Sequence, residues 1–167
     1  MIPETLLTFP DVTALSGFDP EAILNGKFDR KELTLDVAPG RIVPVCEFLR
    51  DNCGYDFLAD LTCRDDYPTE PRFQVVYHLY SIAKKQFLRL KAGLTSPITP
   101  IPPIIPSDGP SIDTVSTVWP AAGWHEREVF DLFGVRFNGH PDLRRIVMPD
   151  DWVGYPLRKD YPIEGPR

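Results

Sequence analysis

The stretch GWHEREVFDLFG, residues 123–134, gathers side chains that could carry out acid–base chemistry. It places one imidazole, His125, close to three carboxylates, Glu126, Glu128 and Asp131. Such groups transfer protons when their geometry and pKa match the substrate. A helical projection puts Glu126 in the middle of the apolar stripe, whereas Glu128 and Asp131 fall on a face typical of solvated carboxylates. Glu126 is therefore the carboxylate that an ordinary surface helix does not explain.

A carboxylate buried on an apolar face needs a partner, because an unpaired buried charge costs several kcal/mol. Arginine is the favoured partner, since its planar guanidinium pairs with a carboxylate through two hydrogen bonds. The sequence offers Arg144 and Arg145 in DLRRI, and Arg158 with Lys159 in PLRKD. We expect either that one of these cations folds back onto Glu126 or that Glu126 faces another protein. Both roles are structural.

No other pattern of catalytic or metal-binding residues accompanies this stretch. No histidine stands four residues after His125, so the zinc-protease pattern is incomplete, and no phosphate loop or dinucleotide-binding turn is found. The sequence also lacks a serine nucleophile elbow. Cys46, Cys53 and Cys63 do not have the close spacing of a zinc or iron–sulfur site, and we interpret them as buried thiols in a reducing cytoplasm. We therefore predict no catalytic, cofactor-binding or metal-binding residue in this chain.

Length and charge narrow the classes of protein further. With 167 residues the chain is long enough for one domain with a substantial core. A net charge of −6 argues against nucleic acid as the main partner, because phosphate-binding surfaces carry an excess of basic side chains. No stretch approaches the roughly 18 consecutive apolar residues of a membrane-spanning helix. The N-terminal residues lack the basic start of a signal peptide.

Hydrophobic periodicity predicts the elements that must position these side chains. Asp19, Pro20 and Gly26 suit the start and end of a short helix, and a longer amphipathic helix is expected over 41–53, ended by Gly54. Alternating patterns predict strands in the following ranges: 30–38, 55–63, 72–82 and 86–94, with 111–118 returning to the sheet. The short connection AKKQ predicts an antiparallel hairpin. We expect an α+β fold, a two-layer sandwich of a mostly antiparallel or mixed sheet with a few helices.

Two segments lie outside this pattern. Residues 96–112 hold six prolines and predict a polyproline-like surface loop, with a docking peptide as the alternative. Residues 138–167 show no helical or strand period, yet Trp152, Tyr155 and Tyr161 are unlike the composition of a disordered tail. We therefore divide the chain into an α+β domain, 1–137, and an extended C-terminal docking arm, 138–167. The C-terminal arm is expected to lie across its own domain or a partner.

The region WPAAGWHEREVFDLFGVRFNGHPDLRRIVMPDDWVGYPLRKDYP closely resembles the signature of the C subunit of the proton-pumping NADH:quinone oxidoreductase, respiratory complex I. The elements E-R-E-x-x-D-x-x-G, H-P-x-L-x-R-I and P-L-R-K-D-[FY] occur in order. The resemblance covers residues 115–162 strongly, and the order of elements over 19–94 is also similar. It marks the following residues as signature and interface positions: Glu126, Arg127, Glu128, Asp131, Gly134, His140, Pro141, Leu143, Arg144, Arg145, Pro156, Leu157, Arg158, Lys159 and Asp160.

The resemblance implies a structural subunit that binds no flavin and no iron–sulfur cluster, while FMN and the clusters belong to partner subunits. It implies a place in the hydrophilic arm of the complex, peripheral on the cytoplasmic side of the bacterial membrane. The chief partner would be the D subunit, which helps to form the quinone site. The proline-rich stretch 96–112 is longer than the connection usual in the family, and the chain ends soon after KDYP, unlike fusions of the C and D subunits.

Two other functions stay open at this point. Related subunits occur in membrane-bound hydrogenases and in the plastoquinone-reducing complex of photosynthetic membranes, and the sequence does not identify the electron donor. A free-standing adaptor that uses its proline-rich loop is an alternative of another class. A small hydrolase is disfavoured, because no nucleophile or metal site accompanies the carboxylates.

Overall fold

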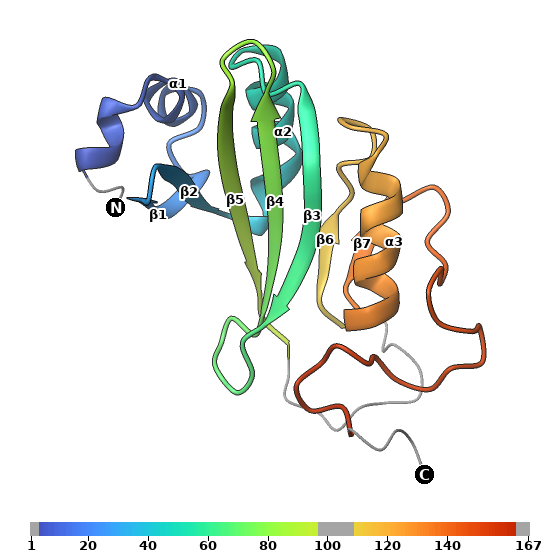
Figure 1. Ribbon diagram of the computed structural model, residues 1–167. Coiled ribbons are helices and arrows are strands. Elements are labelled where there is room, and N and C mark those ends of the chain that lie inside the picture. Colours follow the sequence, from blue (N-terminus) through green and yellow to red (C-terminus); the bar gives the residue numbers. More distant parts are fainter. Residues whose placement is uncertain (1–3, 97–108, 163–167) are drawn as a thin grey trace.

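A five-stranded mixed sheet forms the centre of the computed structural model, which describes residues 4–96 and 109–162. The strand order is β1-β2-β5-β4-β3, and β2 pairs with β5 in parallel while the other pairs are antiparallel. The strands are β1 (Ile23–Asp29), β2 (Glu32–Val37), β3 (Phe57–Asp65), β4 (Phe73–Ser81) and β5 (Gln86–Leu94). Helix α2 (Ile42–Asp51), entered through the 3-10 turn η2 (Pro39–Arg41), lies against one face of the sheet (Figure 1). The predicted α+β sandwich is confirmed.

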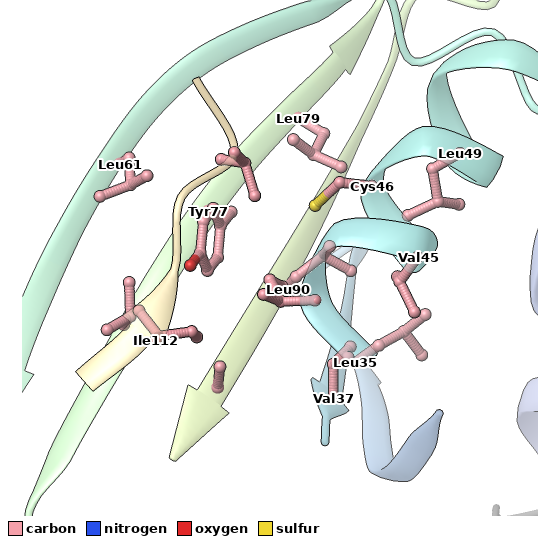
Figure 2. Close-up of a cluster of buried hydrophobic side chains, with 14 of the residues drawn as sticks. Leu35, Val37, Val45, Cys46, Leu49, Leu61, Tyr77, Leu79, Leu90 and Ile112 are labelled. Atoms are coloured by element: carbon pink, nitrogen blue, oxygen red, sulfur yellow. The ribbon is translucent and has the colours of Figure 1, made fainter. Parts of the chain in front are cut away.

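The core lies between α2 and this sheet because both present a regular apolar face. Ile42, Val45, Cys46 and Leu49 recur with the helical period and are fully buried. Figure 2 shows Cys46 and Leu49 facing strand side chains that alternate along the sheet. Those labelled in the figure are Leu35, Val37, Leu61, Tyr77, Leu79 and Leu90. The predicted helix over 41–53 and the β4–β5 hairpin are confirmed.

The N-terminal prediction was wrong. The helix is α1 (Pro10–Phe18), after the 3-10 turn η1 (Glu4–Thr8), and the residues expected to be helical enter strand β1. Gly26 does not end a helix but sits in β1, where an added Cβ would lie 2.8 Å from Leu6 and 2.9 Å from the Thr34 carbonyl oxygen. Pairing with β2 and packing by η1 therefore outweigh the capping pattern around Asp19 and Pro20.

Strand β3 also departs from simple alternation. Its register shifts between Leu58 and Asp60, so Phe57 is exposed and Leu58 is buried. A bulge of this kind reverses the faces of the preceding residues, and no periodicity count detects it. The remainder of β3 keeps the expected alternation, with Leu61 and Cys63 buried.

A second, small layer holds the signature helix. The signature helix α3 (Ala122–Phe133) packs beside β3, next to a two-stranded parallel sheet of β6 (Ser111–Asp113) and β7 (Arg136–Asn138) (Figure 1). The expectation that 111–118 returns to the main sheet was wrong, because β6 pairs with β7 instead. Gly134 ends α3 in a left-handed conformation with φ of 72°, which glycine adopts without strain.

Beyond β7, residues 139–162 contain neither helix nor strand within the described part. They pass around α3 and return beneath the sheet (Figure 1). Most of the proline-rich stretch 96–112 lies outside the described residues. In the described part of the chain, no helix is long and apolar enough to cross a membrane. The division into a domain of residues 1–137 and a C-terminal arm stays a prediction.

Candidate functional site

Glu126 is fully buried, as the projection predicts, but its partners are not the expected cations. Its two carboxylate oxygens accept hydrogen bonds from the Val115 backbone N–H, at 2.8 Å, and from the Thr114 hydroxyl. Among the described residues, no lysine or arginine nitrogen lies within 4.0 Å of this carboxylate. Burial raises the pKa of Glu126 to about 7, against the opposing effect of the two hydrogen bonds. The expected pairing with an arginine or lysine was therefore wrong, and so was the alternative that Glu126 faces another protein, because its side chain is buried inside this chain.

His140 stands beside Glu126 without forming a hydrogen bond to it. The His140 Nε2 atom lies 3.8 Å from Glu126 Oε2 and 3.0 Å from the Gly123 carbonyl oxygen. The Nδ1 atom accepts the backbone N–H of Asp142, which fixes Nε2 as the protonated nitrogen. His140 thus ties the start of α3 to the turn that follows β7. Its imidazole is used in backbone contacts.

Asp131, expected on a solvated face, is fully buried and is the carboxylate that binds an arginine. Arg145 Nη1 donates to Asp131 Oδ1 at 2.6 Å. Three consecutive backbone N–H groups, those of Ile146, Val147 and Met148, donate to Asp131 Oδ2 at 2.7–3.0 Å. Burial alone would raise the pKa of Asp131, but these donors together lower it. The C-terminal arm supplies every one of these donors.

Helix geometry explains how two carboxylates on α3 are both buried. Glu126 and Asp131 are five residues apart, so they point about 140° away from each other around the axis. Glu126 faces the segment after β6, and Asp131 faces the C-terminal arm. The arm therefore covers a side of α3 that the helix alone would leave in water.

A second buried ion cluster joins the C-terminal arm to the main sheet. Arg72, only 1% exposed, pairs with Asp65 through two hydrogen bonds of 2.9 and 3.0 Å. Asp160 of the C-terminal arm accepts from the same guanidinium at 2.7 Å, and the Lys159 backbone N–H donates to Asp65. Sequence reasoning missed Arg72 and Asp65, because neither stands in a motif and their partners in the C-terminal arm are 88 and 94 residues away.

Aromatic packing fixes the arm between these two ion clusters. The Arg158 guanidinium lies 4.5 Å from the centroid of Tyr155 and 5.1 Å from that of Phe73, and it donates to the Phe133 carbonyl oxygen. Burial, and then the neighbouring Arg72, lower the pKa of Arg158. At Gly134 an added Cβ would lie 2.6 Å from Arg158 and 2.8 Å from the Tyr155 ring. Only glycine fits at this crossing.

The remaining signature residues lie around these contacts. Arg127 donates to the carbonyl oxygens of Arg144 and Arg145 and stacks over Trp124. Leu143 packs against the core, and Leu157 donates its backbone N–H to Leu132. Glu128 is exposed, as predicted. The other signature residues are exposed or half-buried, and they are Pro141, Arg144, Pro156 and Lys159.

The buried thiols and the polar side chains of the signature are engaged inside this chain. Within residues 4–96 and 109–162, no group of three or more histidine, cysteine or acidic side chains is placed to hold a metal ion. Burial raises the pKa of Cys63 to about 12 and that of Cys46 further, so these thiols are poor nucleophiles. The side chains of Glu126, Asp131 and His140 each form hydrogen bonds to other segments of the chain.

Comparisons with known proteins agree with the signature. The family described as "Respiratory-chain NADH dehydrogenase, 30 Kd subunit" matches residues 35–167. The C subunit of NADH-quinone oxidoreductase from Geobacter sulfurreducens is 52% identical over 146 residues, covering 87% of this chain and 83% of the relative. The Roseiflexus castenholzii protein of the same name is 44% identical, over 86% of this chain and 78% of the relative.

A solved structure shares the fold as well. It is titled as the membrane-bound sulfane sulfur reductase, an archaeal respiratory membrane complex. The matching chain is 26% identical, with a TM-score of 0.74, and the match covers 91% of this chain and 84% of that one. The resemblance read from the signature is thus confirmed, and the chain belongs to the family of the NADH-quinone oxidoreductase C subunits, the 30 Kd subunits of the respiratory-chain NADH dehydrogenase.

Proposed function

We propose that this chain is a cofactorless structural subunit in the hydrophilic arm of NADH:quinone oxidoreductase. There it supports electron transfer from NADH to quinone, coupled to proton translocation, by holding redox-carrying subunits in place. The observation that carries the proposal is 52% identity over 87% of the chain to a relative named as the C subunit of NADH-quinone oxidoreductase. FMN and iron–sulfur clusters would belong to the partner subunits.

The geometry of the signature supports a non-catalytic role. An acid–base catalyst needs a titratable group within hydrogen-bond reach of a bound substrate. Glu126 and Asp131 are fully buried and bonded to other segments of this chain, and His140 is bonded at both ring nitrogens. These side chains stabilise the junction of α3, β7 and the C-terminal arm.

The C-terminal arm is the segment we propose for contact with the D subunit on the cytoplasmic side of the membrane. Its inner side chains hold it to its own domain through Asp131 and Arg72. Its outer side chains include four large apolar residues that are 38–58% exposed, which is typical of a surface that meets another protein. They are Ile146, Val147, Val153 and Leu157.

The fold match to the sulfane sulfur reductase complex favours one alternative. It shows that a chain of this fold occurs in a respiratory membrane complex named for a substrate other than NADH. The alternative is therefore an equivalent subunit of a related complex, with a different electron donor or acceptor. Because this subunit would not touch the donor, its own side chains do not separate the two.

Purification from native membranes tests the proposal. The full chain, tagged and expressed at native level, should be recovered with flavin- and iron–sulfur-containing subunits and with NADH-dependent quinone reduction. Expressed alone, it should show no visible absorbance and no NADH oxidation. A flavin or cluster bound to the isolated chain, or recovery as a free monomer away from membranes, would contradict the proposal. Recovery with a complex that reduces quinone or sulfur without NADH would support the alternative.

A further inference from the structure

The five-stranded sheet has one face against α2, and no described helix covers its other face (Figure 1). At one end of this uncovered face, Phe57, Tyr80 and Phe87 are cross-strand neighbours on β3, β4 and β5. We call them the aromatic row. Phe57 is 50% and Phe87 58% exposed, and the ring centroids of Tyr80 and Phe87 are 4.6 Å apart. Exposed aromatic side chains on adjacent strands are typical of protein interfaces.

A groove of about 420 Å³ lies further along the same face. Its lining includes Lys91 of β5, Arg64 of β3 and one carboxylate, Asp36 of β2. Within the described residues Lys91 has no acidic partner within 4.0 Å, although Asp36 is its cross-strand neighbour. Burial, and then the neighbouring Arg64, lower the pKa of Lys91, and Asp36 opposes them.

The other cations of the face add to this positive charge. Lys27 of β1 lies opposite Thr34 of β2, and its charge also lowers the pKa of Lys91. Arg64 and Arg89 are already matched by carboxylates, Asp66 at 2.6 Å and Glu32 at 2.7 Å. Among the described residues, Lys27 and Lys91 have no such ion pair. Within the described residues, Lys91 is therefore a cation of the groove without an ion pair, and its complement is a carboxylate.

The two features are close enough for one short segment to reach both. Lys91 is four residues along β5 from Phe87, which corresponds to about 13 Å of strand. An extended segment of about five residues spans that distance. We propose that the uncovered face is a docking surface for an acidic segment of a neighbouring subunit, which places an apolar side chain on the aromatic row and a carboxylate beside Lys91. This inference rests on the proposed function, since it requires assembly with other subunits.

Protection of an introduced thiol tests the surface without disturbing it. Thr62 is exposed on β3, in the same row as Val76 and Lys91, and the three native cysteines are buried. Thr62→Cys in the full chain should react with a maleimide at least tenfold more slowly in the purified complex than in the free chain, measured on this subunit by mass spectrometry. Arg41→Cys, in η2 at the other side of the sheet, serves as the matched control for reactivity outside the surface. Equal rates for Thr62→Cys in complex and free chain would overturn the proposal.

Charge reversal tests the chemistry of the partner. Lys91→Glu should reduce the recovery of partner subunits with the tagged chain at least tenfold, whereas Lys91→Arg and the control Arg41→Glu should leave it unchanged. Unchanged recovery for Lys91→Glu would overturn the acidic partner. A free chain that sediments as a dimer, and that Lys91→Glu makes monomeric, would assign the face to a second copy instead. If the wild-type chain recovers no partner subunits at all, the proposed function itself fails.

Discussion

The two buried carboxylates of α3 have opposite environments although both are 0% exposed. Asp131 accepts hydrogen bonds from one guanidinium and three backbone N–H groups. Within the described residues, Glu126 accepts one backbone N–H and one hydroxyl, with an imidazole nitrogen 3.8 Å away. The pKa of Asp131 is therefore lowered, and that of Glu126 is raised to about 7. Burial by itself thus does not decide the charge of a carboxylate, because the donors that surround it do.

The difference has opposite consequences for stability as the pH changes. The lowered pKa of Asp131 gives stability that is present above the unfolded value near 3.8 and is lost as the pH falls through the folded value. The raised pKa of Glu126 gives stability that is full below 4.5 and is lost as the pH rises through about 7. Asp131 thus holds the C-terminal arm as an anion, whereas Glu126 is most stabilising as a neutral acid.

Among the changes that separate the two carboxylates, removal of the C-terminal arm should lower the free energy of unfolding the most. Deletion of residues 140–167 takes away every donor of Asp131 and the contact of Asp160 with Arg72, while the carboxylate of Glu126 keeps its two hydrogen bonds. We expect a loss of on the order of 5 kcal/mol or more in the free energy of unfolding, measured by urea denaturation. Retention of wild-type stability would show that these contacts contribute nothing.

Asp131→Asn should have the next largest effect. The amide keeps the shape of the side chain but leaves Arg145 without a counter-charge and replaces an acceptor oxygen with a donor. Loss of one partner from a buried ion pair costs about 3–5 kcal/mol. Urea denaturation at pH 7 measures it, with Asp142→Asn as the control at an exposed pair. A loss of less than about 1 kcal/mol in the free energy of unfolding would contradict a buried ion pair and indicate that Asp131 is solvated.

Gly134→Ala should have an intermediate effect, at the junction of α3 and the C-terminal arm. The positive φ of 72° and the close approach of Arg158 and Tyr155 leave no room for a Cβ atom. We expect a loss of about 1–3 kcal/mol. Gly17→Ala is the matched control, because no atom lies within 4 Å of its added Cβ and alanine favours the helix there. Thermal unfolding of both variants should therefore show a lower midpoint only for Gly134→Ala.

Glu126→Gln should have the smallest effect at low pH. The amide oxygen of a glutamine can accept the Val115 N–H, as a Glu126 oxygen does. Its amide nitrogen can donate to the Thr114 hydroxyl oxygen, which accepts instead of donating. At pH 5.5 we expect a change of less than about 1 kcal/mol. At pH 8 the variant should be more stable than the wild type, because only the wild type then buries an ionised group. Thr114→Val, which removes the hydroxyl that lowers the pKa of Glu126, should be destabilised more strongly at pH 8 than at pH 5.5, because the pKa of Glu126 then rises further.

The sequence predicted what depends on local periodicity. The strands β2 to β5, helix α2 and the burial of Glu126 follow from apolar spacing along one element. The β4–β5 hairpin follows from the short connection AKKQ.

What the sequence did not predict depends on segments far apart in the chain. The burial of Asp131 requires residues 145–148 to fold around it, and the burial of Arg72 requires Asp160. A projection of α3 alone shows only which side faces the sheet, so it assigned the other side to water. The capping pattern at Asp19 failed for a similar reason, because pairing with β2 and packing by Leu6 decide the conformation of β1.

The most direct measurement compares Glu126→Gln and Asp131→Asn with the wild type at pH 5.5 and pH 8, by urea denaturation of the free chain. Both variants replace a carboxylate with an amide on helix α3, so the main difference between them is the set of groups that surrounds each side chain. We predict that Asp131→Asn is less stable than the wild type at both pH values. Glu126→Gln should match the wild type at pH 5.5 and exceed its stability at pH 8. Equal losses for the two variants at both pH values would contradict the account.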